Sequence, residues 1–178
     1  MKEFFTTRNL TIAGIIILAA LSRLIPHLMG LHLNIAPIMA LSLFGGAYFT
    51  DKKAAFIVPM AAMLLSDIFL GFHPLMFVVY GAFALGVVIG RTMNNKVSAK
   101  RVFGSSLAAS IMFFVVTNFA HWMMYCPISV NGLVQCYVAA IPFFRNSLAS
   151  DLVWSAVFFG SFELAGRFIP QLAENRIK

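Results

Sequence analysis

The sequence RVFGSSLAASIMFFVVTNFAHWMMY, residues 101–125, decides the fold class of this chain. After Arg101 it contains no Lys, Arg, Asp or Glu. An α-helix needs about 20 predominantly apolar residues to cross the hydrocarbon core of a bilayer. Because a run of this length without charge is far more typical of a membrane span than of a soluble core helix, it predicts a transmembrane helix.

The composition extends this prediction to the whole chain. Of the 178 residues, 61% are hydrophobic and 11% are charged, whereas a soluble domain carries about 25% charged residues. So little polar surface cannot cover a water-soluble protein of this size. We therefore expect one integral membrane domain over residues 1–178, with no separate soluble module.

Other apolar runs predict five further spans, which gives an all-α polytopic bundle of six transmembrane helices. We expect these spans at residues 11–25, 35–50, 54–71, 75–91 and 146–169. The first run lacks a clear cleavage site, so we interpret it as a retained span and not as a signal peptide. The run at 132–144 is too short to cross and contains Pro142, which predicts a re-entrant or interfacial helix.

Basic residues give the topology. Cytoplasmic loops collect Lys and Arg, and with six spans most of the basic residues fall on the side of the two termini. These are Lys2, Arg8, Lys52, Lys53, Arg91, Lys96, Lys100, Arg101, Arg167, Arg176 and Lys178. Only Arg23 and Arg145 fall on the other side. Both termini are thus expected in the cytoplasm, in a multi-pass protein of the bacterial cytoplasmic (inner) membrane.

The net charge of +7 follows from this topology. No segment is dense enough in Lys and Arg to form a phosphate-binding face. The sequence therefore predicts the lipid bilayer as a partner and no nucleic acid.

Polar side chains from at least five spans fall at one depth near the outer face, and they are the candidate substrate-binding residues. They are Arg23, Asn34, Asp67, Tyr80, Asn118, His121, Trp122, Arg145, Asn146 and Asp151. The cytoplasmic halves of the spans are almost wholly apolar or small. A channel needs polar groups through the whole membrane, so this pattern predicts an outward-facing cup over an apolar floor.

Each role has an alternative. Arg23 and Arg145 are suited to bind anionic or carbonyl groups, but Arg23 is also suited to reach lipid headgroups. Asp67 is equally consistent with a structural ion pair to either arginine. Trp122 fits either stacking on a flat ring or the aromatic belt of the interface. The first outer loop and the 132–144 segment are expected to act as lids. Small-residue spacings at Gly45-Gly46 and at Gly86 to Gly90 predict close helix packing.

Cys126 and Cys136 lie in the outer loop before the last span. In an oxidising compartment they would form a disulfide, and two independent apolar thiols are the alternative. No Cys and His spacing matches a structural zinc site. His27, His32 and His73 form only a weak metal candidate, so we expect no metal and no cofactor.

No catalytic motif is present. The sequence has no Walker A sequence, no nucleophile elbow and no His-Glu-x-x-His helix. Asp67 and Asp151 are the one candidate dyad, in no diagnostic context. We therefore expect that the protein is not an enzyme.

Several motifs together resemble an uncharacterised bacterial family of six-span transport proteins, over residues 23–159. They are Arg23-Leu24-Ile25-Pro26-His27, Asn34-x-Ala36-Pro37, Leu43-Phe44-Gly45-Gly46-Ala47-Tyr48-Phe49, Ser66-Asp67 with Gly71, Phe113-Phe114 to Asn118, and Ala140-Ile141-Pro142-Phe143-Phe144 with Asn146. That family is similar in size and layout to the S-components of energy-coupling factor (ECF) vitamin transporters.

The resemblance implies capture of a small, vitamin-like micronutrient from outside. It also implies docking on an ECF-type energising module, which consists of a transmembrane coupling protein and two ATPases. S-components often dock through an Ala-x-x-x-Ala face on the first span, and here Ala13, Gly14, Ala19 and Ala20 are spaced differently. An importer that works without such a module is therefore a second possibility. The alternative function is a structural or assembly subunit of a membrane complex that has no small-molecule substrate.

Overall fold

The computed structural model of the protein describes residues 7–21, 24, 37–94 and 96–169. Within these ranges the chain forms six α-helices and no strand, as the all-α prediction requires. The helices are α1 (Thr7–Leu21), α3 (Ile38–Tyr48), α4 (Lys52–Leu70), α5 (Met76–Arg91), α6 (Ala99–Tyr125) and α7 (Val130–Phe168).

Three of these helices, α4, α6 and α7, are long and apolar enough to cross a membrane. Many of their large apolar side chains face outward, among them Phe69 at 63% exposure and Phe103 at 58%. A soluble protein rarely leaves so much contiguous apolar surface in water. The described helices therefore indicate a membrane-associated helical protein. The shorter helices α1 and α3 adjoin residues outside the described ranges.

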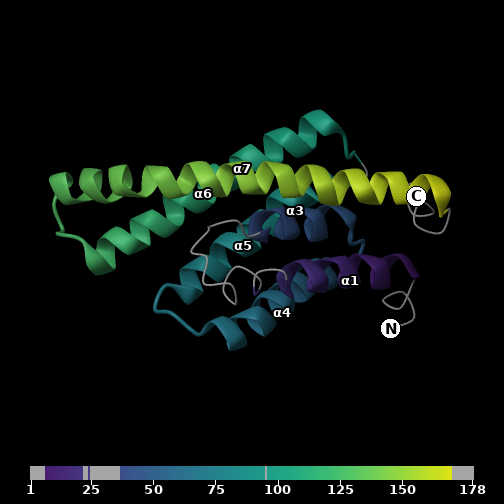
Figure 1. The fold of residues 1–178 in the computed structure, drawn as a ribbon, viewed down its shortest axis with the longest axis horizontal. Helices are drawn as coiled ribbons and strands as arrows, with labels where there is room; N and C mark the ends of the chain where they lie inside the picture. Colours follow the sequence, from purple (N-terminus) through teal and green to yellow (C-terminus); the bar gives the residue numbers. More distant parts are fainter. Residues whose placement is uncertain (1–6, 22–23, 25–36, 95, 170–178) are drawn as a thin grey trace.

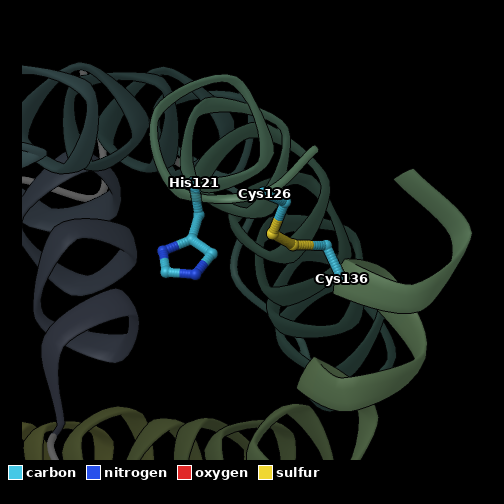
Figure 2. Close-up of side chains that lie close together, drawn as sticks. All are labelled: His121, Cys126 and Cys136. Atoms are coloured by element: carbon cyan, nitrogen blue, oxygen red, sulfur yellow. A yellow bond between two sulfur atoms is a disulfide. The ribbon is translucent and has the colours of Figure 1, made fainter. Parts of the chain in front are cut away.

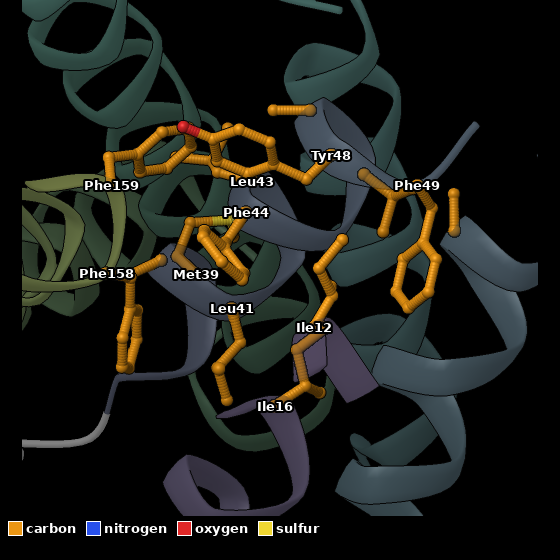
Figure 3. Packing of buried hydrophobic residues seen from close by; sticks show 14 of the residues in the cluster. Ile12, Ile16, Met39, Leu41, Leu43, Phe44, Tyr48, Phe49, Phe158 and Phe159 are labelled. Carbon is orange, nitrogen blue, oxygen red and sulfur yellow. The ribbon is translucent and has the colours of Figure 1, made fainter. Parts of the chain in front are cut away.

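Helix α3 forms the centre of the bundle and contacts all five other helices. From Met39 to Tyr48 all its residues are buried. Phe44 and Tyr48 pack against a row of phenylalanines on α7, with the Phe44 and Phe159 rings 5.5 Å apart and almost perpendicular (Figure 3). The hydroxyl of Tyr48 donates a 2.7 Å hydrogen bond to Glu163 Oε1. A helix that is apolar on all sides is a core helix, which α3 is here.

Glycines let α3 and α5 approach closely, as the small-residue spacing predicts. A Cβ on Gly90 of α5 would lie 2.9 Å from the Cα of Leu43, and one on Gly86 would collide with Met39 and Ser42. In the opposite direction, a Cβ on Gly46 of α3 would lie 3.1 Å from the Cα of Gly90. The contact of these two backbones therefore requires glycine on both helices.

Side-chain caps fix where α4, α6 and α7 begin. The Asp51 carboxylate accepts hydrogen bonds from the backbone N–H groups of Lys53 and Ala54, at 3.1 and 3.2 Å. Ser98 and Ser129 cap α6 and α7 in the same way. An oxygen side chain at this position satisfies N–H groups that a helix cannot pair internally. The polar residues between the apolar runs therefore set the helix ends.

Helix α7 corrects the prediction of a separate short helix at residues 132–144. Those residues and the expected last span form one helix of 39 residues, about 58 Å long at about 1.5 Å per residue. It runs along the whole molecule in Figure 1. Proline removes one backbone hydrogen bond and normally interrupts a helix. Here α7 contacts α6 on both sides of Pro142, through Tyr137 before it and Asp151 after it, and this packing holds the helix continuous.

Candidate functional site

A cavity of about 590 Å³ lies between the second half of α6 and the first half of α7. Its size falls within the range of about 300–1,000 Å³ typical of small-molecule sites. Most of its lining is apolar. Its polar lining residues are Ser110, Asn118, His121, Gln135, Ser147 and Asp151. A mainly apolar hollow with a few polar groups is the usual form of a ligand pocket.

Aromatic rings form one wall of this cavity. The Phe114 and Phe144 rings lie 4.5 Å apart at an interplanar angle of 33°, and Phe113 and Phe143 complete the aromatic lining. Tyr137 braces this wall, because its hydroxyl donates a 2.7 Å hydrogen bond to the Val115 carbonyl. The wall therefore consists of rings from both α6 and α7, and the contacts between these rings fix its shape.

The floor of the cavity is a buried polar contact. The Ser110 hydroxyl donates a 2.8 Å hydrogen bond to Asp151 Oδ2. The backbone N–H groups of Met39 and Ala40 lie close to the same side chain. These two groups belong to the first turn of α3, which has no side-chain cap of its own. Asp151 therefore places its carboxyl group at the N-terminus of α3 from a different helix, a position that favours acidic side chains.

The polar contact continues below the floor. One helical turn away, the Ser155 hydroxyl donates a 3.2 Å hydrogen bond to Ser106 Oγ, and both residues are buried. A second cavity of about 450 Å³ begins at this pair and reaches Glu163 and Arg167. Along the α6–α7 contact, the region below the cavity therefore includes a hydrogen-bonded pair of small polar residues. Sequence patterns did not reveal this, because a serine in an apolar helix is commonly satisfied by its own helix backbone.

The α6–α7 turn closes the other end of the cavity. Cys126 and Cys136 form a disulfide between the end of α6 and the first half of α7, which decides the alternative that the sequence left open. Trp122 Nε1 donates a 3.1 Å hydrogen bond to the Pro127 carbonyl. His121 lies beside the disulfide on the α6 side (Figure 2). These contacts hold the turn over the cavity.

Three predicted site residues line the cavity together: Asn118, His121 and Asp151. The Asn118 amide donates a 2.8 Å hydrogen bond to the Phe114 carbonyl one turn earlier, which fixes its orientation. The His121 ring lies 4.9 Å from the Tyr125 ring and is exposed. Asn118 and His121 are three residues apart and share one face of α6, and this spacing was the sequence signal that grouped them.

The other predicted residues lie elsewhere. The Tyr80 hydroxyl donates a 2.8 Å hydrogen bond to Asp67 Oδ2, which joins α5 to α4 away from the cavity lining. Trp122 is held at the turn, as described above. Arg145 and Asn146 are exposed on α7 and do not line the cavity. Arg23 and Asn34 lie outside the described residues.

Three polar lining residues were missed by the sequence analysis: Ser110, Gln135 and Ser147. Gln135 and Ser147 belong to the two segments that the sequence assigned to different helices. Because α7 is continuous, both face α6 across the same cavity. Recognising one long helix would have brought them into the candidate site.

The fold and its cavity define a class, the helical membrane-associated proteins with a ligand-sized hollow between two long helices. Residues 4–172 match the family of unknown function DUF6580, and the chain belongs to that family. No curated protein matches the sequence. No solved structure matches the fold.

Proposed function

We propose that this protein is a membrane transport protein of the bacterial cytoplasmic membrane. It captures a small, vitamin-like micronutrient from the outer side in the α6–α7 cavity. The observation that carries the proposal is the cavity itself, with its aromatic wall and its few polar groups at defined positions. A hollow of this kind is the default binding site of an uncharacterised fold.

The proposed topology has six membrane crossings with both termini in the cytoplasm. The basic residues Lys52 and Lys53 lie at the start of α4, Arg101 near the start of α6 and Arg167 near the end of α7. The α6–α7 turn lies at the opposite end of the molecule from the end of α7 (Figure 1). Because cytoplasmic ends collect Lys and Arg, this turn and the cavity beside it fall on the outer side.

The cavity lining indicates the chemistry of the ligand. Among the described residues, neither Lys nor Arg lines it, and its floor is the Asp151 carboxylate. An anionic ligand would meet no opposite charge there. The phenylalanine wall is suited to stack on a flat ring, and Asn118, His121 and Gln135 are suited to hydrogen-bond its edge. We therefore expect a flat ring compound that is neutral or weakly basic and carries polar substituents.

The length of α7 supports a lid at the outer surface. At about 58 Å it exceeds the hydrocarbon thickness of about 30 Å even when tilted. Its first turns, which carry Gln135, would then lie at or above the outer interface. A ligand could enter there from water without crossing the acyl chains.

Energy for uptake would come from outside the chain. The sequence carries no ATP-binding motif, and the resemblance to S-components suggests an ECF-type energising module. A solitary importer is the other arrangement of the same function. Co-expression with such a module, followed by co-purification, distinguishes the two.

Thermal unfolding of the purified protein against a panel of vitamins and related ring compounds tests the proposal. A ligand at 100 times its Kd stabilises the folded state by about 2.7 kcal/mol. Ala140→Trp fills the cavity, because Ala140 lines it. Ala149→Trp places the same ring on an exposed position of α7 outside the lining. A compound that stabilises the wild type and Ala149→Trp but not Ala140→Trp supports the proposal.

A membrane assembly subunit is the alternative function. It predicts that no compound stabilises the protein and that a stoichiometric membrane partner co-purifies through the outer face. That pair of results would replace ligand capture with a structural role.

A further inference from the structure

A group of three metal-ligating side chains lies at the rim of the cavity. His121 comes from the last turns of α6, Cys126 ends that helix, and Cys136 lies on α7. Their donor atoms, one ring nitrogen and two sulfurs, all lie within 4.8 Å of one another. Figure 2 shows the imidazole beside the disulfide that joins the two sulfurs.

Two thiolates and one imidazole are ligands that suit a zinc-class cation. Tetrahedral zinc binds sulfur at about 2.3 Å and imidazole nitrogen at about 2.0–2.1 Å, which places its ligand atoms about 3.6–3.8 Å apart. A disulfide holds its two sulfurs about 2.0 Å apart, so after the bond breaks they must separate by about 1.7 Å to reach that spacing. The Cα atoms of Cys126 and Cys136 lie 6.7 Å apart, and rotation of the two side chains supplies this separation.

The turn that presents the three residues is held by contacts that do not involve sulfur. The Trp122 indole binds the Pro127 carbonyl at 3.1 Å, and the Gly132 N–H binds Ser129 Oγ at 3.0 Å. Gly132 also packs so closely on Pro127 that a Cβ there would lie 3.2 Å from the proline Cβ. The positions of the two cysteines therefore do not depend on the bond between them.

We propose that reduction of the Cys126–Cys136 disulfide creates a binding site for one zinc-class divalent cation, with His121 as the third ligand. This inference is independent of the captured substrate. A dithiol supplies two electrons and two protons, the S–S bond breaks, and the dithiol becomes a disulfide. Metal binding then releases one proton from each thiol, so that two thiolates and one neutral imidazole bind the cation.

The geometry leaves one coordination position for a fourth ligand. Zinc sites with three protein ligands keep such a position open to water or to a small molecule. All three residues line the cavity, so the open position faces into it. Cys126 and Cys136 are partly buried and His121 is exposed, so that both the dithiol and the cation can reach the site.

Cobalt(II) binding to the purified, tag-free protein tests the proposal. The protein is reduced with a dithiol, passed through a gel-filtration column without oxygen, and titrated with Co²⁺. The expected result is a thiolate-to-cobalt charge-transfer band that saturates at one ion per chain and disappears when Zn²⁺ is added. The oxidised protein should show no such band, because a disulfide supplies no thiolate.

Single-residue variants make the result specific. His121→Ala should weaken Co²⁺ binding at least tenfold, and Cys136→Ser should abolish the charge-transfer band of the tetrahedral site. His73→Ala removes an exposed histidine on the α4–α5 connection and should change nothing. If Cys136→Ser does not fold, the surface variant His121→Ala still decides the question.

Three results would overturn the proposal: no band in the reduced wild type, an equal band in the oxidised protein, or unchanged affinity in His121→Ala. Because no organic ligand takes part, any of these leaves the proposed capture function intact. Conversely, failure of the ligand panel leaves the metal titration unaffected.

Discussion

Ser110 on α6 and Asp151 on α7 are joined by a 2.8 Å hydrogen bond at the floor of the cavity. The N–H groups of Met39 and Ala40, at the start of the buried helix α3, lie close to the same side chain. One side chain thus connects three helices where the ligand-sized hollow ends. A buried carboxylate is costly unless it is hydrogen-bonded in this way, so this contact ties the shape of the cavity to the stability of the bundle.

Asp151→Ala should destabilise the protein by about 1–3 kcal/mol, because the buried Ser110 hydroxyl loses its acceptor and the start of α3 loses the carboxyl group beside it. Ser110→Ala removes one hydrogen bond within the membrane and should cost about 0.6 kcal/mol. Unfolding in detergent, followed by circular dichroism, measures both. Ser161→Ala is the control, since this exposed hydroxyl bonds only its own helix. A wild-type unfolding midpoint in Asp151→Ala would contradict the role given to this residue.

Gly90→Ala should destabilise the bundle by about 1–3 kcal/mol, because the new methyl group overpacks the contact with Leu43. Gly81→Ala is the matched control on the same helix, where a Cβ meets nothing within 4 Å. That change should be neutral or stabilising by up to about 1 kcal/mol, since alanine favours helix. Melting temperatures of the two variants give the comparison. Equal effects would mean that α3 and α5 are not in close contact.

Tyr48→Phe should lower stability by about 1 kcal/mol, because it removes the hydrogen bond to Glu163 and keeps the ring packing. Glu163→Ala should have a similar effect, and the double variant should be no worse than either single one. Tyr125→Phe on an exposed position is the control. Additive losses in the double variant would show that the two side chains do not interact.

Membrane-impermeant maleimide labelling tests the proposed topology in a background of Cys126→Ser and Cys136→Ser. Ile128→Cys and His73→Cys lie on the α6–α7 and α4–α5 connections and should be labelled in intact cells. Lys96→Cys lies on the α5–α6 connection and should be labelled only after permeabilisation. All three positions are exposed. The reverse pattern would place the cavity on the cytoplasmic side.

Hydropathy predicted the helical class because a bilayer requires long apolar helices. The ends of α4, α5 and α6 follow the predicted spans within a few residues, since Asp51 and Ser98 are both polar breaks and helix caps. The glycine spacing of α5 predicted close helix packing, and the structure identifies α3 as the partner. These features are determined by residues close together in the chain, so the sequence alone was sufficient to predict them.

The features that the sequence did not reveal depend on contacts between residues that are far apart in the chain. Pro142 indicated a break that packing between α6 and α7 overrides. Asp151 was chosen as an outer polar residue, but its partners Met39 and Ala40 lie more than a hundred positions earlier in the chain. Ser106 and Ser155 each look like an ordinary small helix residue, and only their pairing across two helices makes the polar contact below the cavity.

The central claim is that the α6–α7 cavity holds a small molecule. Native mass spectrometry of the protein purified gently from its own membranes tests it most directly. The expected spectrum shows one bound organic compound on the wild type and on Ala149→Trp, and none on Ala140→Trp. A bare chain in every sample, or a compound that remains bound to Ala140→Trp, would contradict the claim.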